Sequence, residues 1–348
     1  MKYHLVSGAC GFVGRNFVKH LLKNTDDKII AIDDLSIGTN PSTWLEDTTE
    51  RSFKDITIFG KDERVYFWET DFRNFLRRSL DEPGFLKNEF DLDVTKLNDV
   101  FHFAAIVGGR AKIDGDPLKV SLDLSIDAEF FYWVVQAKPE RVLYPSSSAA
   151  YPNSLQREET AVALKETDVN VNGDVLGKPD MTYGWTKMTG EYLAHLAATH
   201  YGVSVTCIRP FSGYGEDQDL TYPVPAIAAR AARKEDPFEV WGSGEQGRDF
   251  VHIDDVIDCT LTAMDKIHDG SAINIGSGKL TSFIDLIQLF GSFAGYNPTI
   301  KPLLDKPVGV HSRYCNMDYV KEILGWEPKI SIEEGMKRVY DKALELYV

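Results

Sequence analysis

Tyr183 and Lys187 are the side chains whose type and spacing point most directly to chemistry, namely proton transfer. They lie four residues apart at the start of a helix predicted over 181–201, so both face the same side of that helix. A phenol with a pKa of about 10 is a poor base at neutral pH, but a neighbouring ammonium group favours the phenolate. We therefore expect Lys187 to lower the pKa of Tyr183, and Tyr183 to transfer a proton. An ordinary pair on a helix surface has the same spacing and is the plain alternative.

A run of three serines, Ser146-Ser147-Ser148, follows a strand predicted over 141–145. In folds with a parallel sheet, ligands bind at the carboxyl ends of the strands, where this run would lie. A hydroxyl group there would share the proton of a bound substrate with Tyr183. Runs of serine also occur in loops without a function, so the run alone does not decide between the two interpretations.

Three glycines near the amino end have the pattern of a dinucleotide site. Gly8, Gly11 and Gly14 follow an apolar strand predicted over 2–7 and open a helix predicted over 12–23. In such a turn one glycine allows the tight bend, one lets backbone N–H groups approach a pyrophosphate, and one lets helix and strand pack closely. The helix amino terminus adds partial positive charge. The spacing G-x-x-G-x-x-G differs from the common G-x-G-x-x-G, and a simple tight turn is the alternative, but the flanking strand and helix favour the dinucleotide site.

Acidic residues after the next two strands indicate which dinucleotide binds. Asp33 ends a strand predicted over 28–32, where a carboxylate accepts hydrogen bonds from the adenosine ribose and repels a 2′-phosphate. This selects NAD over NADP, with Asp34 as the alternative if the register shifts by one residue. Asp71 follows a strand predicted over 65–69 and is placed to bind the adenine amino group, although a solvated loop acid is nearly as good an interpretation.

The elements that must position these residues alternate between strands and helices. Those that complete the pattern are strands over 100–104 and 204–208, a helix over 117–137, a strand-like segment over 250–257 and a long irregular segment over 35–60. This alternation indicates the α/β class, with a doubly wound, Rossmann-type parallel sheet. After residue 210 prolines and glycines cluster and the elements shorten. We expect residues 1–210 to form an NAD-binding domain, residues 211–348 a smaller mixed α/β domain that binds substrate, and residues 248–258 to return to the first domain.

The bulk composition is that of a globular protein and excludes several functions. The chain has 348 residues, 43% of them hydrophobic and 26% charged, with a formal net charge of −15. A nucleic-acid-binding protein needs a basic face, against which this balance argues. The four cysteines lie far apart, and the histidines show no metal-binding spacing, so we expect neither disulfides nor a metal. There is no apolar run long enough for a membrane span and no signal-like amino terminus, so we expect the cytoplasm.

Further motifs extend these observations over nearly the whole chain. They are 33–36 (DDLS), 101–105 (FHFAA), 146–151 (SSSAAY), 209–211 (RPF), 248–255 (RDFVHIDD), 274–278 (NIGSG) and 324–328 (LGWEP). With the glycines and the segment from Tyr183 to Lys187, they resemble the extended short-chain dehydrogenase/reductase family, in its branch of nucleotide-sugar epimerases and dehydratases. Within that branch the chain resembles UDP-sugar 4-epimerases.

The resemblance implies a mechanism and a set of contacts. Tyr183 takes a proton from a sugar hydroxyl, normally at C4, hydride passes to NAD⁺, and Lys187 binds the nicotinamide ribose. The family's serine stands four residues before Tyr151, which is Ser147, with Ser148 as the neighbouring alternative. Further cofactor contacts would be Phe12, Val13, Asp71, Phe72, Phe103, Ala104 and Ala105. Arg248 and Arg313 would bind the diphosphate of a nucleotide sugar, and Gly109, Arg110, Ser148 and Ser212 would line the rest of the substrate site. The family also implies a homodimer through the helices over 117–137 and 181–201.

Departures from the family pattern narrow the chemistry. Members that dehydrate usually carry Glu two residues before Tyr151, and members that epimerise at C3 and C5 usually carry Cys, but this chain has Ala149. Alanine performs neither reaction, which leaves oxidation, turnover of the keto-sugar and re-reduction, that is, 4-epimerisation. Other features are closer to GDP-sugar 3,5-epimerases and GDP-fucose synthases, namely Gly108-Gly109 and Tyr151-Pro152. Ser212 replaces a common asparagine, and Arg110 is either a ligand of a sugar carboxylate or phosphate or a solvated loop charge.

Several alternatives stay open at this point. Within the same class they are another nucleotide-sugar epimerase, a 4,6-dehydratase or a 4-ketoreductase, with a GDP-sugar as a possible substrate. The alternative from a different class is a catalytically silent NAD-binding scaffold. Such a protein would typically lack Tyr183 or Lys187, and both are present.

Overall fold

The computed structural model describes residues 1–108 and 110–348 and, within these ranges, every side chain outside 110–112. Its central sheet consists of β1 (Tyr3–Ser7), β2 (Lys28–Asp33), β3 (Glu50–Phe53), β4 (Ile56–Phe59), β5 (Val65–Glu69), β6 (Asp99–His102), β7 (Arg141–Pro145), β8 (Val205–Pro210) and β13 (Asp269–Ile275). The strand order is β13-β8-β7-β6-β1-β2-β5-β4-β3. Neighbours from β13 to β5 run parallel, and only the β5–β4–β3 edge is antiparallel. The predicted α/β class with a doubly wound parallel sheet is therefore confirmed.

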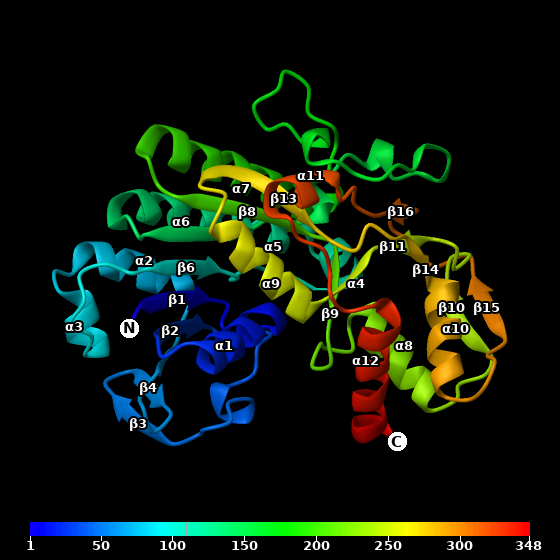
Figure 1. Cartoon of the computed structure of the whole chain (residues 1–348), viewed down its shortest axis with the longest axis horizontal. Helices are drawn as coiled ribbons and strands as arrows, with labels where there is room; N and C mark the ends of the chain where they lie inside the picture. Colours follow the sequence, from blue (N-terminus) through cyan, green and yellow to red (C-terminus); the bar gives the residue numbers. More distant parts are fainter. Residues whose placement is uncertain (109) are drawn as a thin grey trace.

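Helices cover both faces of this sheet (Figure 1). The helices α1 (Phe12–Asn24) and α9 (Ile253–Met264) pack on one face, and α2 (Phe72–Asp81), α6 (Asp123–Ala137) and α7 (Met181–Tyr201) pack on the other. Side chains alternate between the two faces along each strand, so Val6 joins one core and Leu5 the other. Burial on both faces explains why these strands are almost continuously apolar. Three shorter helices and a fourth beside β13 complete this part: α3 (Phe85–Phe90), α4 (Arg110–Gly115), α5 (Pro117–Val120) and α11 (Asp318–Leu324).

A second, smaller part has a hydrophobic core of its own and lies at the right of Figure 1. The helices around this core are α8 (Pro223–Ala232), α10 (Phe283–Phe293) and α12 (Ile332–Tyr347). Its strands form small sheets: β9 (Ser212–Tyr214) with β12 (Phe250–His252), β10 (Phe238–Trp241) with β15 (Ile300–Leu303), and β14 (Thr281–Ser282) with β11 (Gly247–Arg248) and β16 (Ser312–Arg313). The mixed character expected beyond residue 210 is therefore present.

Three expectations about individual elements are wrong. The bounds expected for the return to the first domain, 248–258, are too short, because the chain continues through α9 into β13, which pairs with β8. The helix expected over 117–137 is broken at Ser121 and Leu122 into α5 and α6. The strand-like segment over 250–257 is the short strand β12 followed at once by α9.

The segment over 35–60, expected to be irregular, contains the β3–β4 hairpin. Its tight turn is formed by Lys54-Asp55, with Lys54 at a φ of 52°. Such turns usually carry Asn-Gly or Asp-Gly, so the sequence lacked the common signal for this hairpin. In the described part of the chain, every helix is too short or too polar to cross a lipid bilayer.

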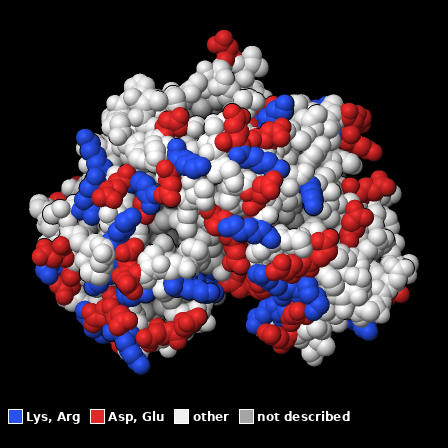
Figure 2. Space-filling view, viewed as in Figure 1, with Lys and Arg blue, Asp and Glu red and all other residues white. Residues whose placement is uncertain are grey.

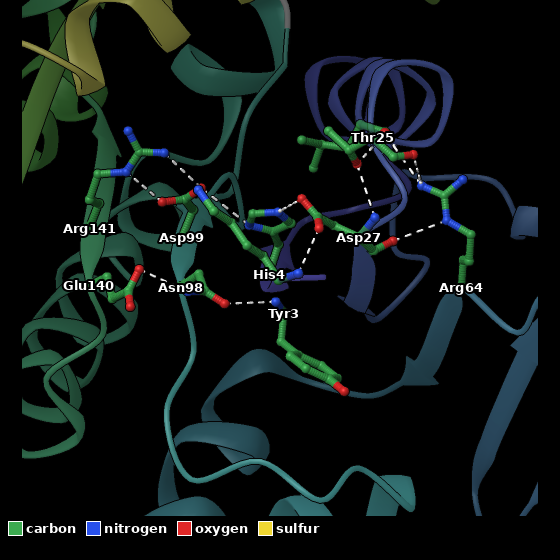
Figure 3. Close-up of polar contacts among 11 residues, drawn as sticks. Tyr3, His4, Thr25, Asp27, Arg64, Asn98, Asp99, Glu140 and Arg141 are labelled. Atoms are coloured by element: carbon green, nitrogen blue, oxygen red, sulfur yellow. Dashed lines mark hydrogen bonds and ion pairs between the residues drawn. The ribbon is translucent and has the colours of Figure 1, made fainter.

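A cluster of charged side chains joins the strands at the amino edge of the sheet (Figure 3). His4 on β1 lies buried between two carboxylates, 3.1 Å from Asp27 and 3.3 Å from Asp99. Arg141 on β7 donates two hydrogen bonds to Asp99, at 2.6 and 2.9 Å. Burial opposes ionisation of Asp99, but the hydrogen bonds from His4 and Arg141 outweigh it and hold the pKa of this carboxyl well below its usual range. The cluster therefore fixes β1, β6 and β7 together at the edge opposite the predicted site.

Candidate active site

The three glycines form a compact turn between β1 and α1, and each has a different steric surrounding. Gly8 has a φ of 63°, and a Cβ atom there would lie 2.6 Å from the backbone of Phe103 and Ala104. A Cβ at Gly14 would lie 2.1 Å from the carbonyl oxygen of Gly8, so this glycine lets the helix pack against the turn. A Cβ at Gly11 would meet only the Gly8 oxygen, at 3.4 Å, which is ordinary contact. Gly11 is thus not required by the protein's own packing, and its open side suits a ligand.

The amino terminus of α1 has the properties of an anion site. Gly11 occupies the capping position and has no side chain to satisfy the first N–H groups of the helix. The first turn, residues 12–15, carries no acidic residue and includes Arg15. Backbone N–H groups and the helix dipole at such an end favour a pyrophosphate. The residues present therefore fit the phosphates of a dinucleotide.

Asp33 links the glycine turn to the end of β2. Its carboxylate is buried and accepts hydrogen bonds from the backbone N–H groups of Cys10 and Leu35, both at 2.8 Å. Burial raises the pKa of Asp33, and these hydrogen bonds oppose the rise. Asp34 is exposed and accepts a hydrogen bond from Ser36 N–H at 2.9 Å. Asp33, rather than its neighbour, therefore lies against the glycine turn.

The residues expected to contact the adenine and the rest of the dinucleotide differ in burial and in the partners they already have. Asp71 caps the amino end of α2 and forms an ion pair of 2.5 Å with Arg73, so its role toward adenine stays a prediction. Phe72 is buried, with its ring 5.4 Å from that of His102, so only its backbone is available to a ligand. The remaining expected contacts are partly exposed near the glycine turn or packed against its core, namely Phe12, Val13, Phe103, Ala104 and Ala105.

Tyr183, Lys187 and Ser147 come together at the carboxyl ends of the strands. Tyr183 and Lys187 lie on the first turns of α7, with the lysine ammonium 5.7 Å from the centre of the tyrosine ring. The hydroxyl of Ser147, on the loop after β7, lies close enough to the Tyr183 phenol to lower its pKa. Ser148 is buried in the short turn that follows. Of the two serines considered, the structure brings Ser147 to the tyrosine.

Lys187 lowers the pKa of Tyr183, as expected, but burial is the larger effect and leaves this pKa above its usual value. Burial raises the pKa of Tyr183 and outweighs the opposing charge of Lys187 and the opposing effect of the Ser147 hydroxyl. Two carboxylates, Asp123 and Asp127, raise it further. The sequence showed the lysine but not the degree of burial, which is the larger effect. Tyr183 therefore holds its proton firmly at neutral pH unless positive charge is added nearby.

Asp123 and Asp127 are the main site residues that sequence reasoning missed. They lie one turn apart on α6, each is 1% exposed, and both act electrostatically on Lys187. The available signal was a pair of acids with i, i+4 spacing in a helix that is otherwise largely apolar on its inner side.

The two arginines expected to bind a diphosphate are neighbours in the second part. Arg248 on β11 and Arg313 on β16 are paired residues of adjacent parallel strands. Arg248 donates to the carbonyl of Gly247 at 2.6 Å. Arg313 donates to Gln156 at 2.6 Å and to Asp180 at 2.8 Å. Because Asp180 immediately precedes α7, Arg313 connects the second part to the helix that carries Tyr183.

Two further residues of the 248–255 motif hold loops in place. Asp249 is fully buried and accepts hydrogen bonds from the backbone N–H groups of Ser277, Gly278 and Cys315, at 2.7, 2.9 and 3.2 Å. Asp255 accepts two more, from residues 329 and 330. Much of the motif is therefore structural, and Asp249 fixes the loops next to Arg248.

The remaining predicted substrate residues differ in how far the structure describes them. Ser212 is half-buried on β9, and its N–H donates to the carbonyl of Asp249 at 2.8 Å. Arg110 begins α4, but its side chain lies outside the described residues, as does Gly109 entirely. Figure 2 shows a notch between the lobe that holds α1 and the lobe that holds α12, with acidic and basic side chains interspersed over the visible face.

Comparison with known proteins agrees with this arrangement. The model of a family described as the NAD dependent epimerase/dehydratase family matches residues 4–276. The chain is 25% identical to UDP-glucuronate 4-epimerase of Thermodesulfobacterium geofontis over 350 residues, covering 99% of this chain and 97% of the relative. It is 28% identical to GDP-mannose 3,5-epimerase of Arabidopsis thaliana over 257 residues, covering 72% of this chain and 66% of the relative. A solved structure of a mutant UDP-glucuronic acid 4-epimerase from Bacillus cereus, in complex with UDP-4-deoxy-4-fluoro-glucuronic acid and NAD, matches with a TM-score of 0.78 and 25% identity, covering 99% of this chain and all of that one.

Proposed function

Because this chain belongs to the NAD-dependent epimerase/dehydratase family, we propose that it is a nucleotide-sugar 4-epimerase with Tyr183 as its acid–base residue. The observation that carries the proposal is that Ser147 and Lys187 both lie near Tyr183 and act on its pKa, on the same edge of the sheet as the glycine turn. The 4-epimerases among its relatives support the same reaction.

The side chain at position 149 favours epimerisation at C4 over the other reactions of the family. Ala149 is buried beside Ser147, and its carbonyl accepts a hydrogen bond from Asp180 N–H at 2.9 Å. Its methyl group can neither protonate a leaving hydroxyl nor remove a proton from C3 or C5. The site therefore supplies one acid–base group, which suffices for a reaction that removes and restores the same proton.

The mechanism assigns a task to each residue of the site. NAD⁺, which the glycine turn and Asp33 would hold, would supply positive charge and reversible hydride transfer with the sugar C4. Tyr183 removes the proton of the C4 hydroxyl as the hydride leaves and gives it back when the hydride returns, so the sugar shows no net oxidation. Lys187 stabilises the phenolate in between, which offsets part of the effect of burial. Ser147 holds the C4 oxygen in line with the phenol through its hydroxyl.

The second part of the chain would hold the nucleotide. We assign the diphosphate to Arg248, which is held rigidly between the loops that Asp249 organises, and as a prediction also to Arg313. Ser212 and the segment with Gly109 and Arg110 would line the sugar. Asp33, at the end of β2, would bind the adenosine ribose and disfavour NADP.

A panel of nucleotide sugars tests the proposed reaction. Purified protein is incubated with UDP- and GDP-hexoses and hexuronic acids, and the anomeric NMR signals are followed. A pair of C4 epimers that reaches equilibrium without added reductant supports the proposal. A stable 4-keto-6-deoxy product, or an epimer changed at C3 or C5, would instead identify a dehydratase or a 3,5-epimerase, the latter being the activity named for one relative. Denatured protein should release NAD, and release of NADP would contradict the role given to Asp33.

We further propose a homodimer formed through α6 and α7. Their outer faces carry exposed aromatic side chains, with Tyr132 on α6 64% exposed and Trp185 on α7 45% exposed. Leu124 and Tyr192 extend the same two stripes at helical spacing. Isolated apolar side chains are common on surfaces, but two adjacent stripes on packed helices suit a self-complementary interface.

The double substitution Tyr132→Glu and Trp185→Glu should convert the dimer into a monomer, because it places charges in the centre of the interface. Sedimentation velocity measures the change, with Tyr201→Glu at the end of α7 as a control. A wild-type chain that sediments as a monomer at all concentrations would overturn the proposal.

All four cysteines are buried free thiols, and we propose a reducing compartment, the cytoplasm, as the place of action.

A further inference from the structure

Two carboxylates buried behind the catalytic pair differ in how they are satisfied. Asp127 is saturated: His102 lies 3.1 Å from one oxygen, and the hydroxyl of Tyr144 donates to the other at 2.6 Å. His102 in turn contacts the hydroxyl of Ser7 at 2.8 Å, at the end of β1. Asp127 is thus the centre of a buried hydrogen-bond network that ties α6 to three strands.

Asp123 lies one helical turn before Asp127 and is also buried, but only one of its carboxylate oxygens accepts a hydrogen bond from the described part of the chain. One carboxylate oxygen accepts a hydrogen bond from Ile106 N–H at 2.6 Å. The other is buried and has no hydrogen-bond partner among the residues that the structure describes. A buried carboxylate that lacks a partner is costly to the fold. Burial accordingly raises the pKa of Asp123 to about 6, and the opposing charge of Lys187 is the largest influence that stabilises its ionised form.

Among the described side chains, the groups that face Asp123 come from α6, α7, β6 and β7. Lys187 and Tyr183 face it from α7, and Asp127 from its own helix, with His102 and Tyr144 behind on β6 and β7. The lysine is buried as well, and the charges of Tyr183, Asp127 and Asp123 more than offset this burial and keep its pKa above the usual value. One ammonium therefore balances two carboxylates and a phenol that must ionise during the reaction.

We propose that Asp123 is a positioning residue, whose negative charge attracts the Lys187 ammonium toward α6 and sets the charge against which Tyr183 ionises. The proposal rests on the proposed function for its catalytic meaning, but its electrostatic content applies to the protein without substrate. A purely structural acid would have both oxygens satisfied, as Asp127 has. The fold instead retains the Asp123 carboxylate, which lowers the stability of the folded state but stabilises the charged form of Lys187.

Asp123→Asn in the full-length protein tests this, since asparagine keeps the shape and the bond from Ile106. Protein with ¹³C-labelled tyrosine Cζ is titrated by NMR, and Tyr183→Phe identifies the Tyr183 signal. We expect Tyr183 to ionise about one pH unit lower in the variant, because a nearby negative charge is removed. The variant should also unfold at the same or a higher temperature at pH 7.5, because the wild-type carboxylate is ionised at a cost there. Glu129→Gln, an acid on the same helix paired with Arg77, is the matched control and should change neither value.

If the chain epimerises nucleotide sugars, Asp123→Asn should lower kcat at its pH plateau about tenfold, leave KM for the sugar within about twofold, and shift the acidic limb of the kcat profile to lower pH. An unchanged Tyr183 titration together with a lower unfolding temperature would make Asp123 a structural residue and overturn the proposal. If the variant does not fold, the wild-type Tyr183 signal decides, because it should show a step near pH 6 as Asp123 ionises, and a flat signal there would contradict the proposal. If no sugar is epimerised, the NMR titration of Tyr183 still tests the electrostatic role of Asp123. The proposed function and the role of Asp123 can therefore fail separately.

Discussion

Tyr183→Phe should reduce kcat by roughly a thousandfold, because it removes the acid–base group and leaves the rest of the site in place. The phenylalanine ring fills the same volume beside Lys187, so the fold loses only the hydroxyl group near Ser147. Turnover of the best nucleotide sugar, measured by NMR or a coupled assay, gives the rate. Calorimetry with the same nucleotide sugar should show binding within a few-fold of the wild type.

The control for this substitution is Tyr201→Phe, at the exposed carboxyl end of the same helix. It removes a hydroxyl far from Ser147 and should leave kcat unchanged. Retention of substantial activity by Tyr183→Phe would mean that another group carries the proton. Loss of nucleotide-sugar binding together with activity would point to a disrupted site instead, and would leave Tyr183 without its assigned role.

Gly14→Ala should destabilise the protein by about 3 kcal/mol, because the new Cβ atom would lie 2.1 Å from the backbone oxygen of Gly8. Neither atom belongs to a flexible side chain, so the turn or the helix must move to relieve the clash. Thermal and urea unfolding measure the loss of stability, and the displaced turn should also bind NAD poorly.

Gly11→Ala is the matched control, because it lies in the same turn and its Cβ would meet only ordinary contact at 3.4 Å. Gly11 has a φ of −68° and a ψ of 170°, which alanine adopts without strain. This variant should unfold within about 1 kcal/mol of the wild type, yet bind NAD more weakly, since the methyl group occupies the side on which a pyrophosphate approaches. Equal destabilisation by both substitutions would contradict the separate roles given to the two glycines.

The local parts of the site could be predicted from the sequence. The glycine turn, Asp33 at the end of β2 and the pairing of Tyr183 with Lys187 each depend on residues close together in the chain and on one neighbouring element. Counting back from Tyr151 selected Ser147, the hydroxyl that the structure brings to Tyr183. The doubly wound sheet followed from the alternation of elements for the same reason.

The features of the site that could not be predicted from the sequence depend on contacts between segments that are distant in the chain. Asp180 and Arg313 are far apart in the sequence, and neither segment has a pattern that predicts their ion pair. Lys187 lowers the pKa of Tyr183 as expected, but the sequence did not show the burial of the phenol, which is the larger effect and raises this pKa. Asp123 was missed because an acid in a helix is normally read as a solvent-facing residue.

Helix α7 contributes residues both to the candidate active site and to the proposed dimer interface, so dimer formation and catalytic activity would be linked through this helix. Its inner side carries Tyr183 and Lys187, and its outer side carries Trp185 and Tyr192 within the same three turns. In a dimer formed through the outer side, association would fix the helix that sets the catalytic geometry. Binding of a partner to one state stabilises that state in proportion to concentration. Turnover per chain would then fall on dilution below the dissociation constant of the dimer, which makes the enzyme responsive to its own abundance.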